Sequence, residues 1–349
     1  MAFRVTTNGL MRSYRTNLTK INGKVYDTME RVQTTRNFSS SAEDPAAASK
    51  AFQLRRSFWR AQDHIDNTKY LLNKYQMGWT SSGAIVNGDG NSPSLDGIAS
   101  SLAAISDTAA SSRPILGGEL ISKSESMVMC MNVRYNEEFV FAGIDGMNVP
   151  FEWGENGELL YRGVDVSAAE GTEDYEKLQK LATETGYVDV GIGMQEDENG
   201  KIVDSSAFNS AISGIEFLGY GLDEDGDPKN IAVLMNELGN IFQDCDRDTG
   251  EYADSADKER AEVLTRKLRD AINHVQEQHV KLSSQSEYLQ INLTHLEETQ
   301  FTLNTEISEL EQMDPALSVT EMFWAQYCYQ AALKIGNELV SQTLFDYLK

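Results

Sequence analysis

Apolar residues recur at steps of three and four near both ends of the chain, which is the spacing of an amphipathic helix. Two such repeats comprise Leu18, Ile21, Val25, Met29 and Val32 in the N-terminal stretch, and Met322, Ala325, Tyr329, Ala332, Gly336 and Leu339 in the C-terminal one. A helix with so narrow an apolar stripe is not stable alone. The pattern therefore predicts terminal helices over 1–38 and 315–349 that need partners.

A longer repeat, with a period of seven, precedes the C-terminal helix. Its leading positions are apolar throughout: Leu268, Val275, Leu282, Leu289, Leu296, Leu303 and Leu310. The companion positions, four residues on, are mixed: they hold the apolar Ile272, Leu293 and Ile307, but also the polar His279, Ser286 and Gln300. This is a sustained heptad with an imperfect second seam. It predicts a helix over about 255–313, on the order of 85 Å long at ~1.5 Å per residue, which must run along partner helices from the N-terminal half.

The dipeptide Asp-Pro interrupts the helical pattern near both ends, at Asp44-Pro45 and at Asp314-Pro315. Aspartate is a favoured helix N-cap, and proline suits the first helical position, where its missing N–H costs nothing. We therefore predict that a new helix follows each pair and that each pair is a hinge. The hinges separate the terminal helices, 1–44 with 315–349, from a helical rod domain formed by 45–140 with 228–314.

Residues 141–227 have a different character. The dipeptides Asn156-Gly157 and Asn199-Gly200 stand between short apolar runs, which is typical of β-hairpins. This block carries 4 Lys or Arg and 20 Asp or Glu, a net charge of −16 out of −24 for the chain. We predict an acidic, β-rich inserted outer domain here. The predicted fold class is mainly α: a long coiled-coil-like helical rod formed by both chain ends, with a central β-rich inserted domain.

Two patterns suggest a metal site, and neither matches its motif in full. The segment 223–234 has aspartates at positions one, three and five of a calcium loop, but proline at position six and leucine at position twelve. His274 and His279 are five residues apart, whereas a zinc-protease helix needs histidines four apart. No nucleophile-elbow or phosphate-loop motif occurs. We predict no catalytic residues, no cofactor and no metal site, with weak calcium binding by the acidic block left open.

The net charge of −24 argues against binding to nucleic acid or an anionic membrane, because both are polyanions. No run of about 18 apolar residues occurs, so no transmembrane helix is predicted. The N-terminal stretch lacks the apolar region of a cleavable signal peptide. Cys130, Cys245 and Cys328 are widely spaced and form no paired motif. From these features alone, a cytoplasmic location is predicted.

Three segments carry a resemblance to a known family. "SSAEDPAAAS" (40–49) is similar to the Ser-x-Asp-Asp-Pro-Ala segment of the flagellin superfamily, with Glu43 in place of the first aspartate. "NVRYNEEFVFAG" (132–143) and the ending "SQTLFDYL" (341–348) are similar to segments of flagellar hook-filament junction proteins, the hook-associated proteins that adjoin the filament. Filament flagellins usually end differently. The chain therefore resembles the junction family within that superfamily.

The resemblance implies a structural adaptor that forms a ring of identical subunits in the bacterial flagellum, without catalysis. The implied partners are a hook-side hook-associated protein, flagellin, the flagellar export apparatus and an export chaperone. Secretion through flagellar type III export, without a cleaved signal peptide, replaces the cytoplasmic location. The residues expected to form the inner packing tube are Leu18, Ile21, Val25, Val32, Ala332, Gly336, Leu339, Leu344, Phe345 and Leu348.

Three alternatives stay open at this point. The first is a filament flagellin, which has the same architecture at high copy number. The second belongs to another class, a secreted metal-binding or hydrolytic module carried on a helical stalk. The third is an unrelated secreted coiled-coil adhesin, which would not depend on flagellar export.

Overall fold

The computed structural model describes residues 7–88, 93–105, 110–155 and 157–347. The chain divides into two compact units, one formed by 1–62 with 297–349 and the other by 63–296. Long helices dominate both units, and the strands of the described residues lie in the second. The predicted fold class, mainly α with a β-containing central insertion, is confirmed.

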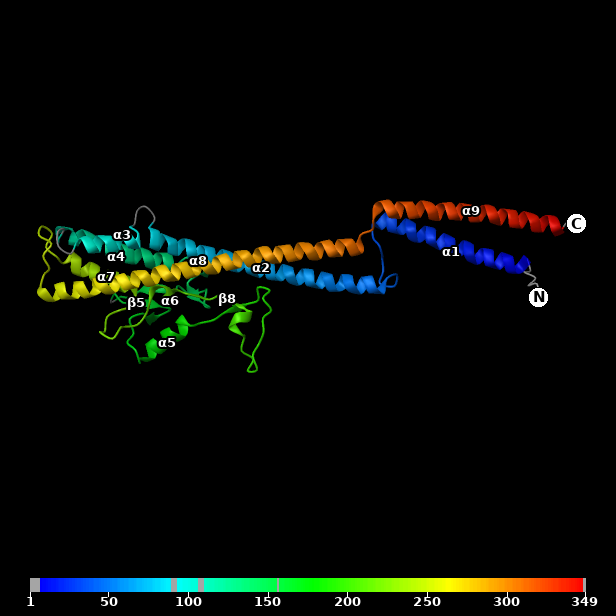
Figure 1. The fold of residues 1–349 in the computed structure, drawn as a ribbon. Coiled ribbons are helices and arrows are strands. Elements are labelled where there is room, and N and C mark those ends of the chain that lie inside the picture. The colour runs from blue at the N-terminus through cyan, green and yellow to red at the C-terminus, as the bar shows by residue number, and fades with distance from the viewer. Residues whose placement is uncertain (1–6, 89–92, 106–109, 156, 348–349) are drawn as a thin grey trace. The chain divides into compact units, whose positions relative to one another are not determined.

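In the first unit, α1 (Thr7–Thr34) and α9 (Pro315–Tyr347) lie side by side and antiparallel (Figure 1). The Tyr14 hydroxyl donates a hydrogen bond to the backbone carbonyl of Ala332, at 3.1 Å. Small side chains lie in the contact, since Thr28, Ser318 and Ala325 are buried. The stripes of three- and four-residue steps therefore mark the sides on which these two helices meet.

Both Asp-Pro pairs cap helices, as the sequence predicts. Pro45 is the first residue of α2 (Pro45–Asn87), and Pro315 is the first residue of α9. The Asp44 carboxylate accepts hydrogen bonds from the N–H groups of Ala46 and Ala47, at 3.1 and 2.9 Å. The Asp314 carboxylate accepts from the next two free N–H groups of α9 in the same way, at 2.8 and 3.2 Å. Each cap satisfies donors that a helix start leaves unpaired.

The two interruptions are also bonded to each other. The backbone N–H of Asn37 donates to the carbonyl of Glu311 at 2.8 Å, and its side-chain amide donates to the carbonyls of Leu310 and Gln312 at 3.1 and 2.9 Å. The N–H of Met313 donates to the carbonyl of Thr35 at 3.2 Å. We call this set of contacts, formed by residues 35–37 and 310–313, the break bridge. The backbone groups that the helices release at their ends are satisfied across it.

The second unit has a helical frame. The frame consists of parts of α2 and α8 (Ser255–Glu311) together with α3 (Leu95–Ala104), the 3₁₀ turn η1 (Ala110–Ser112), α4 (Arg113–Met131) and α7 (Ile231–Gln243). The seven-residue repeat lies in its core, because Leu268, Val275, Leu282, Leu289 and Leu296 are all buried. The observed α8 ends two residues before the end of the helix predicted over 255–313.

Two of the three polar positions of the second seam, His279 and Gln300, have partners on α2. His279 Nδ1 lies 2.8 Å from the hydroxyl of Ser82, which is fully buried, and the imidazole stacks on Trp79 at 5.7 Å. Burial lowers the pKa of His279, so the ring is neutral at neutral pH. In the first unit, the amide of Gln300 donates to that of Gln62 at 2.6 Å. The mixed seam is therefore satisfied by hydrogen bonds that fix the register of α2 against α8.

The insert is built from short antiparallel pairs. These are β1 (Arg134–Tyr135) with β2 (Glu138–Phe139), β3 (Ala142–Gly143) with β9 (Ile212–Ser213), β4 (Phe151–Trp153) with β5 (Leu159–Tyr161) and β6 (Val164–Asp165), and β7 (Tyr187–Val188) with β8 (Phe208–Asn209). The helices α5 (Glu173–Ala182) and α6 (Gly214–Leu218) and the 3₁₀ turn η2 (Asp204–Ser206) complete it. The β3–β9 pair joins the strand that enters the insert to the strand that leaves it.

Both predicted hairpins form. The first is the β4–β5 pair, in which Trp153 faces Leu159, although Asn156 itself lies outside the described residues. The second is a single antiparallel bridge between Glu196 and Ile202, closed by Gly200 at φ +76°. A positive φ suits glycine, which explains the Asn-Gly signal there.

The insert packs along the long helices and shares their core (Figure 1). The Tyr75 hydroxyl of α2 donates to the carbonyl of Asn209 at 2.8 Å. The Asn292 amide of α8 donates to the carbonyl of Val190, also at 2.8 Å. One buried cluster therefore contains side chains of α2, α8 and the insert.

A close crossing of α4 and α7 supplies a stability prediction. A Cβ added to Gly117 would lie 2.6 Å from the carbonyl oxygen of Gly239, whereas one added to Gly118 meets only the amide of Gln243 at 3.6 Å. We expect Gly117→Ala to lower the free energy of unfolding by about 1–3 kcal/mol relative to Gly118→Ala, because backbone atoms cannot move aside easily. Both variants gain the same helix propensity, so the difference between their denaturant melts measures the cost of the steric clash at residue 117. Equal unfolding midpoints for the two variants would contradict the close approach of α4 and α7 at Gly117.

Candidate assembly surface

The first unit has almost no hydrophobic core of its own. The principal buried cluster contains residues from Ile65 to Leu296 only, and all of these belong to the second unit. Among the described side chains of the first unit, the buried hydrophobic residues are Ala51, Ala61, Ala325 and Met313. Three alanines and one methionine bury little apolar area, so this unit gains little hydrophobic stabilisation by itself.

Large apolar side chains of the same unit are exposed instead. On α9, Phe323, Trp324 and Tyr327 are 62, 64 and 66% exposed. Others on this helix are Leu317, Leu333 and Ile335. Scattered exposed hydrophobic residues are ordinary on a protein surface, but a group of aromatic residues on one helix indicates a contact surface.

The helix α9 thus has an inverted arrangement. Its small residues, Ala325 and Gly336, are buried on the side that faces α1, and Tyr329 is half-buried, whereas Phe323, Trp324 and Tyr327 are exposed. The closeness of α1 requires this, because a Cβ at Gly336 would lie 2.0 Å from the Tyr14 hydroxyl. Among the described residues, the pairing of α1 with α9 therefore leaves Phe323, Trp324 and Tyr327 largely exposed. We call Phe323, Trp324 and Tyr327 the outer aromatic face.

The structure describes some of the predicted packing residues. On α1, Leu18, Ile21, Val25 and Val32 are all half-buried. On α9, Ala332 is half-buried and Gly336 is buried against Tyr14 of the same chain. The side chains of Leu339, Leu344 and Phe345, and the whole of Leu348, lie outside the described residues. A role of this set between subunits stays a prediction.

The heptad and hinge residues are placed more fully. The five heptad residues from Leu268 to Leu296 are buried in the second unit, and Leu303 and Leu310 are half-buried in the first. The hinge residues are the capping pairs Asp44-Pro45 and Asp314-Pro315, next to the break bridge. Movement at these pairs stays a prediction.

The outer aromatic face was missed by the sequence reasoning. Periodicity places Ala325, Ala332 and Gly336 on one side of the helix, and Phe323, Trp324 and Tyr327 are then left on the other. The position of these aromatic residues, opposite the stripe of small residues, could therefore have been read from the sequence. Periodicity does not show which side of α9 packs against α1.

The acidic loop 223–227 carries its own cation. Carboxylate oxygens of Asp223, Asp225 and Asp227 lie within 4.8 Å of one another, which would suit a metal ion. The Lys267 ammonium is 2.6 Å from Asp223 and 3.2 Å from Asp225, and it also bonds Asp227. Arg260 pairs with Asp227 as well. A side chain thus neutralises the group of carboxylates, and this arrangement favours a structural role for the loop over calcium binding.

The pKa values in this loop follow from the same contacts. Burial acts to raise the pKa of Asp223, but hydrogen bonds from Lys267 and from the N–H groups of Asp225 and Asp227 outweigh it, so its pKa lies below the usual range. At Asp227, Lys267 and Arg260 likewise outweigh burial and lower the pKa. The carboxylates raise the pKa of Lys267 despite its own burial. All these groups are therefore charged at neutral pH.

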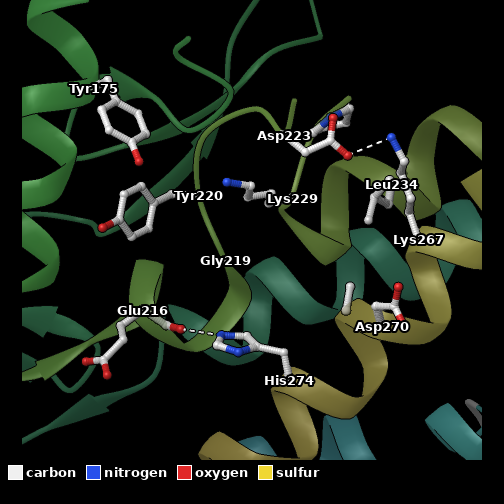
Figure 2. Close-up of a pocket in the computed structure, with 12 residues that line it drawn as sticks. Tyr175, Glu216, Gly219, Tyr220, Asp223, Lys229, Leu234, Lys267, Asp270 and His274 are labelled. Carbon is white, nitrogen blue, oxygen red and sulfur yellow. Dashed lines mark hydrogen bonds and ion pairs between the residues drawn. The ribbon is translucent and has the colours of Figure 1, made fainter. Parts of the chain in front are cut away.

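A cavity of about 460 Å³ adjoins this loop (Figure 2). Figure 2 shows Tyr175 and Tyr220 on one side, and Lys267 and His274 of α8 on the other. Two polar groups in the wall have protein partners: Lys267 is held by the loop, and His274 Nε2 lies 2.8 Å from the Glu216 carbonyl. His274 and His279 serve separate contacts, so they do not form a ligand pair. The lining residues contain no serine or cysteine beside a base, so the arrangement does not favour nucleophilic catalysis.

No helix within the described ranges is both long enough and apolar enough to cross a bilayer. The three cysteines are free thiols, with Cys245 buried, Cys130 half-buried and Cys328 exposed.

Comparison with known proteins gives a match in fold. No protein-family model matches the sequence, and no curated protein does. Among solved structures, the chain is similar to a Vibrio parahaemolyticus protein assigned as a flagellar hook-associated protein, with a TM-score of 0.51 and 14% identity over 77% of this chain and 100% of that one. The chain shares the fold of that protein. FlgL of Bacillus cereus matches with a TM-score of 0.39 and 14% identity, over 73% of this chain and 99% of that one.

The ion cluster gives a pH-dependent prediction. We expect Lys267→Met to lower the free energy of unfolding at pH 7 by roughly 2 kcal/mol, because it leaves crowded carboxylates without their cation. In the wild type, the lowered pKa values of Asp223 and Asp227 give stability that is present above about pH 4 and lost below it. In the variant, the crowded carboxylates take up protons at higher pH, so the difference from wild type shrinks as the pH falls from 7 to about 4.

The measurement is a series of denaturant melts over that pH range. Lys281→Met is the control, because Lys281 makes one exposed pair with Glu216 and its loss should change stability little. A constant difference between Lys267→Met and wild type across the pH range would contradict the ionic role of Lys267.

Proposed function

We propose that this chain is a structural adaptor subunit of the bacterial flagellum. In this proposal, identical subunits form a ring at the hook-filament junction, and the flagellin filament assembles on that ring, without catalysis. The observation that carries the proposal is the inverted arrangement of α9, whose outer aromatic face is about two-thirds exposed in the part of the chain that the structure describes (62, 64 and 66%). The shared fold and the resemblance of the segments 132–143 and 341–348 to junction proteins support it.

The energetics favour assembly through the first unit. Burial of each exposed aromatic residue of α9 would contribute roughly 1–2 kcal/mol. Among its described side chains, the buried hydrophobic ones of the first unit are three alanines and Met313, so packing against neighbouring subunits is the available source of that stabilisation. A weakly stabilised terminal unit also suits export as an unfolded or partly unfolded chain, through the flagellar type III apparatus and with a chaperone. The location in this proposal is extracellular.

The segment 132–143 joins the helices to the insert. Asn136 and Glu137 form the tight turn between β1 and β2 with positive φ angles of 48° and 69°. The Arg134 guanidinium lies over the Phe139 ring at 4.1 Å. The Tyr70 hydroxyl of α2 donates to Glu138 at 2.7 Å, so burial and this carboxylate raise the pKa of Tyr70 to about 12. The residues that carry the resemblance thus fix how the insert leaves the helical frame.

A filament flagellin is the second candidate. It would use the same unpartnered helix surface, and it differs by copy number and by position along the flagellum. The resemblance of the C-terminal ending favours the junction protein, with a hook-side hook-associated protein below the ring and flagellin above it. A secreted metal-binding or hydrolytic module is less well supported, because Lys267 already neutralises the acidic loop.

The first test is deletion of the gene, followed by electron microscopy of the cells and an assay of flagellin in the medium. We expect bare hooks and flagellin released into the medium, because filament subunits would lack the ring on which they assemble. Intact filaments would overturn the junction role and leave a minor flagellin as the explanation. Loss of filaments without released flagellin would point to a role in export.

Variants in the deletion strain test the outer aromatic face. We expect Trp324→Glu to reduce filament number at least tenfold while secretion of the chain continues, because a buried, unpaired carboxylate would destabilise subunit packing. The control is Met147→Glu in the insert, where the replaced side chain is 79% exposed. Normal filaments with Trp324→Glu would contradict the role of this face.

A further inference from the structure

In the first unit, two helical segments each carry charges of a single sign. All four charged residues in 45–62, the first part of α2, are basic. All five charged residues in 297–311, the last part of α8, are glutamates. Helices in solvent normally carry mixed charges that support one another at steps of three and four. One-sign segments on neighbouring helices therefore require an explanation.

The basic segment has a distinct outward face. Phe52, Arg56, Trp59 and Arg60 follow one another at helical spacing and are all exposed, with Phe52 at 71% and Trp59 at 64%. The buried Ala51 marks the opposite side of the helix. We call these four residues the basic face. Arginine beside exposed aromatic rings is the composition of an interface centre.

The acidic segment has an outward face of the complementary kind. Glu298, Glu306 and Glu309 are exposed, and Phe301 between them is 73% exposed. The inward side of this part of α8 carries Leu303, which is half-buried. We call Glu298, Phe301, Glu306 and Glu309 the acidic face.

The two faces do not neutralise each other within one chain. Gln62 and Gln300 are hydrogen-bonded to each other on the inward sides of α2 and α8. One ion pair, Arg55 with Glu311, joins the two segments at their ends. Within the described part of the chain, no ion pair involves Arg56, Arg60 or any charged residue of the acidic face. The charges therefore remain available to another molecule.

We propose that the basic face of one copy docks on the acidic face of the next copy of this chain. The inference rests on the proposed ring and names its side-to-side contact. Two different complementary surfaces on one subunit make a head-to-tail interface, which closes into a ring or continues as a helix. Arginine pairs with carboxylates through two parallel hydrogen bonds, and the aromatic side chains of the two faces supply the apolar area between the ion pairs.

The test uses charge reversal in the purified full-length chain, with sedimentation measured at low salt. We expect Arg56→Glu with Arg60→Glu, and separately Glu306→Arg with Glu309→Arg, to raise the dissociation constant for self-association at least tenfold. An equal mixture of the two variants should restore association, because each then offers the charge that the other lacks. Association of the wild type should weaken as salt is raised.

The control is Lys201→Glu with Arg247→Glu, which changes the net charge as much as the reversal of the basic face does, but at exposed positions of the second unit. Its dissociation constant should match wild type. The restoring mixture also guards against misfolding, since a misfolded variant would not recover with its partner. A mixture that stays dissociated, or a wild type that remains monomeric at every concentration, would overturn the proposal. Loss of association only on reversal of the basic face would show that this face docks on another surface of the neighbouring copy, which also overturns it.

The result of the charge-reversal test can be distinguished from the result of the deletion test of the proposed function. If the deletion leaves filaments intact but the mixture associates, the junction role fails and the interface stands. If the deletion gives bare hooks but the reversed variants associate like wild type, the function stands and this interface fails.

Discussion

The contact between α2 and α8 is the constraint on which the second unit depends. Leucines at seven-residue steps of α8 supply the buried area, and the bond between Ser82 and His279 sets which residues face each other. The insert joins the same seam at Gly78, where an added Cβ would lie 3.2 Å from Val140, 3.3 Å from Leu282 and 3.5 Å from Phe141. A methyl group at this position would crowd side chains of α8 and the insert, so glycine suits the close approach of the three segments. A shift of register along α8 would therefore disturb both the helices and the insert.

The two units differ in where their stability comes from. The second contains the principal hydrophobic cluster, including the insert, and is stabilised by its own contacts. The first combines capped helix starts, the small residues between α1 and α9, and exposed aromatic and charged faces. A unit with this composition has defined helices but little burial of its own. Its order therefore depends on what surrounds it, which is the physical basis of the assembly role proposed above.

The sequence predicted the elements whose signals are local. The heptad located α8 within two residues, because a buried seam repeats at every second turn. The Asp-Pro pairs located the starts of α2 and α9, because capping depends on adjacent residues. The second rod segment, predicted from residue 228, becomes helical only at Ile231, where α7 begins with Asn230 as its cap, while Pro228 pairs with Leu222.

The features that were missed depend on residues far apart in the chain. Nothing near the aspartates of 223–227 indicates that Lys267, 40 positions beyond Asp227, neutralises them. Likewise, the stripe of small residues on α9 fixes one side of the helix, but only the presence of α1 decides that this side is internal. Periodicity groups residues by face, and tertiary contact assigns each face its partner.

The break bridge has a consequence for the order of folding. Asn37 bonds the carbonyl of Gln312 across 275 positions of sequence, so the bridge cannot close until residues from near both chain ends are present together. Closing so long a loop costs chain entropy, which the contacts of the second unit offset by bringing α2 and α8 together first. The terminal helices are consequently the last to acquire fixed positions. A subunit interrupted before residue 310 would leave α1 untethered, even with its second unit fully folded.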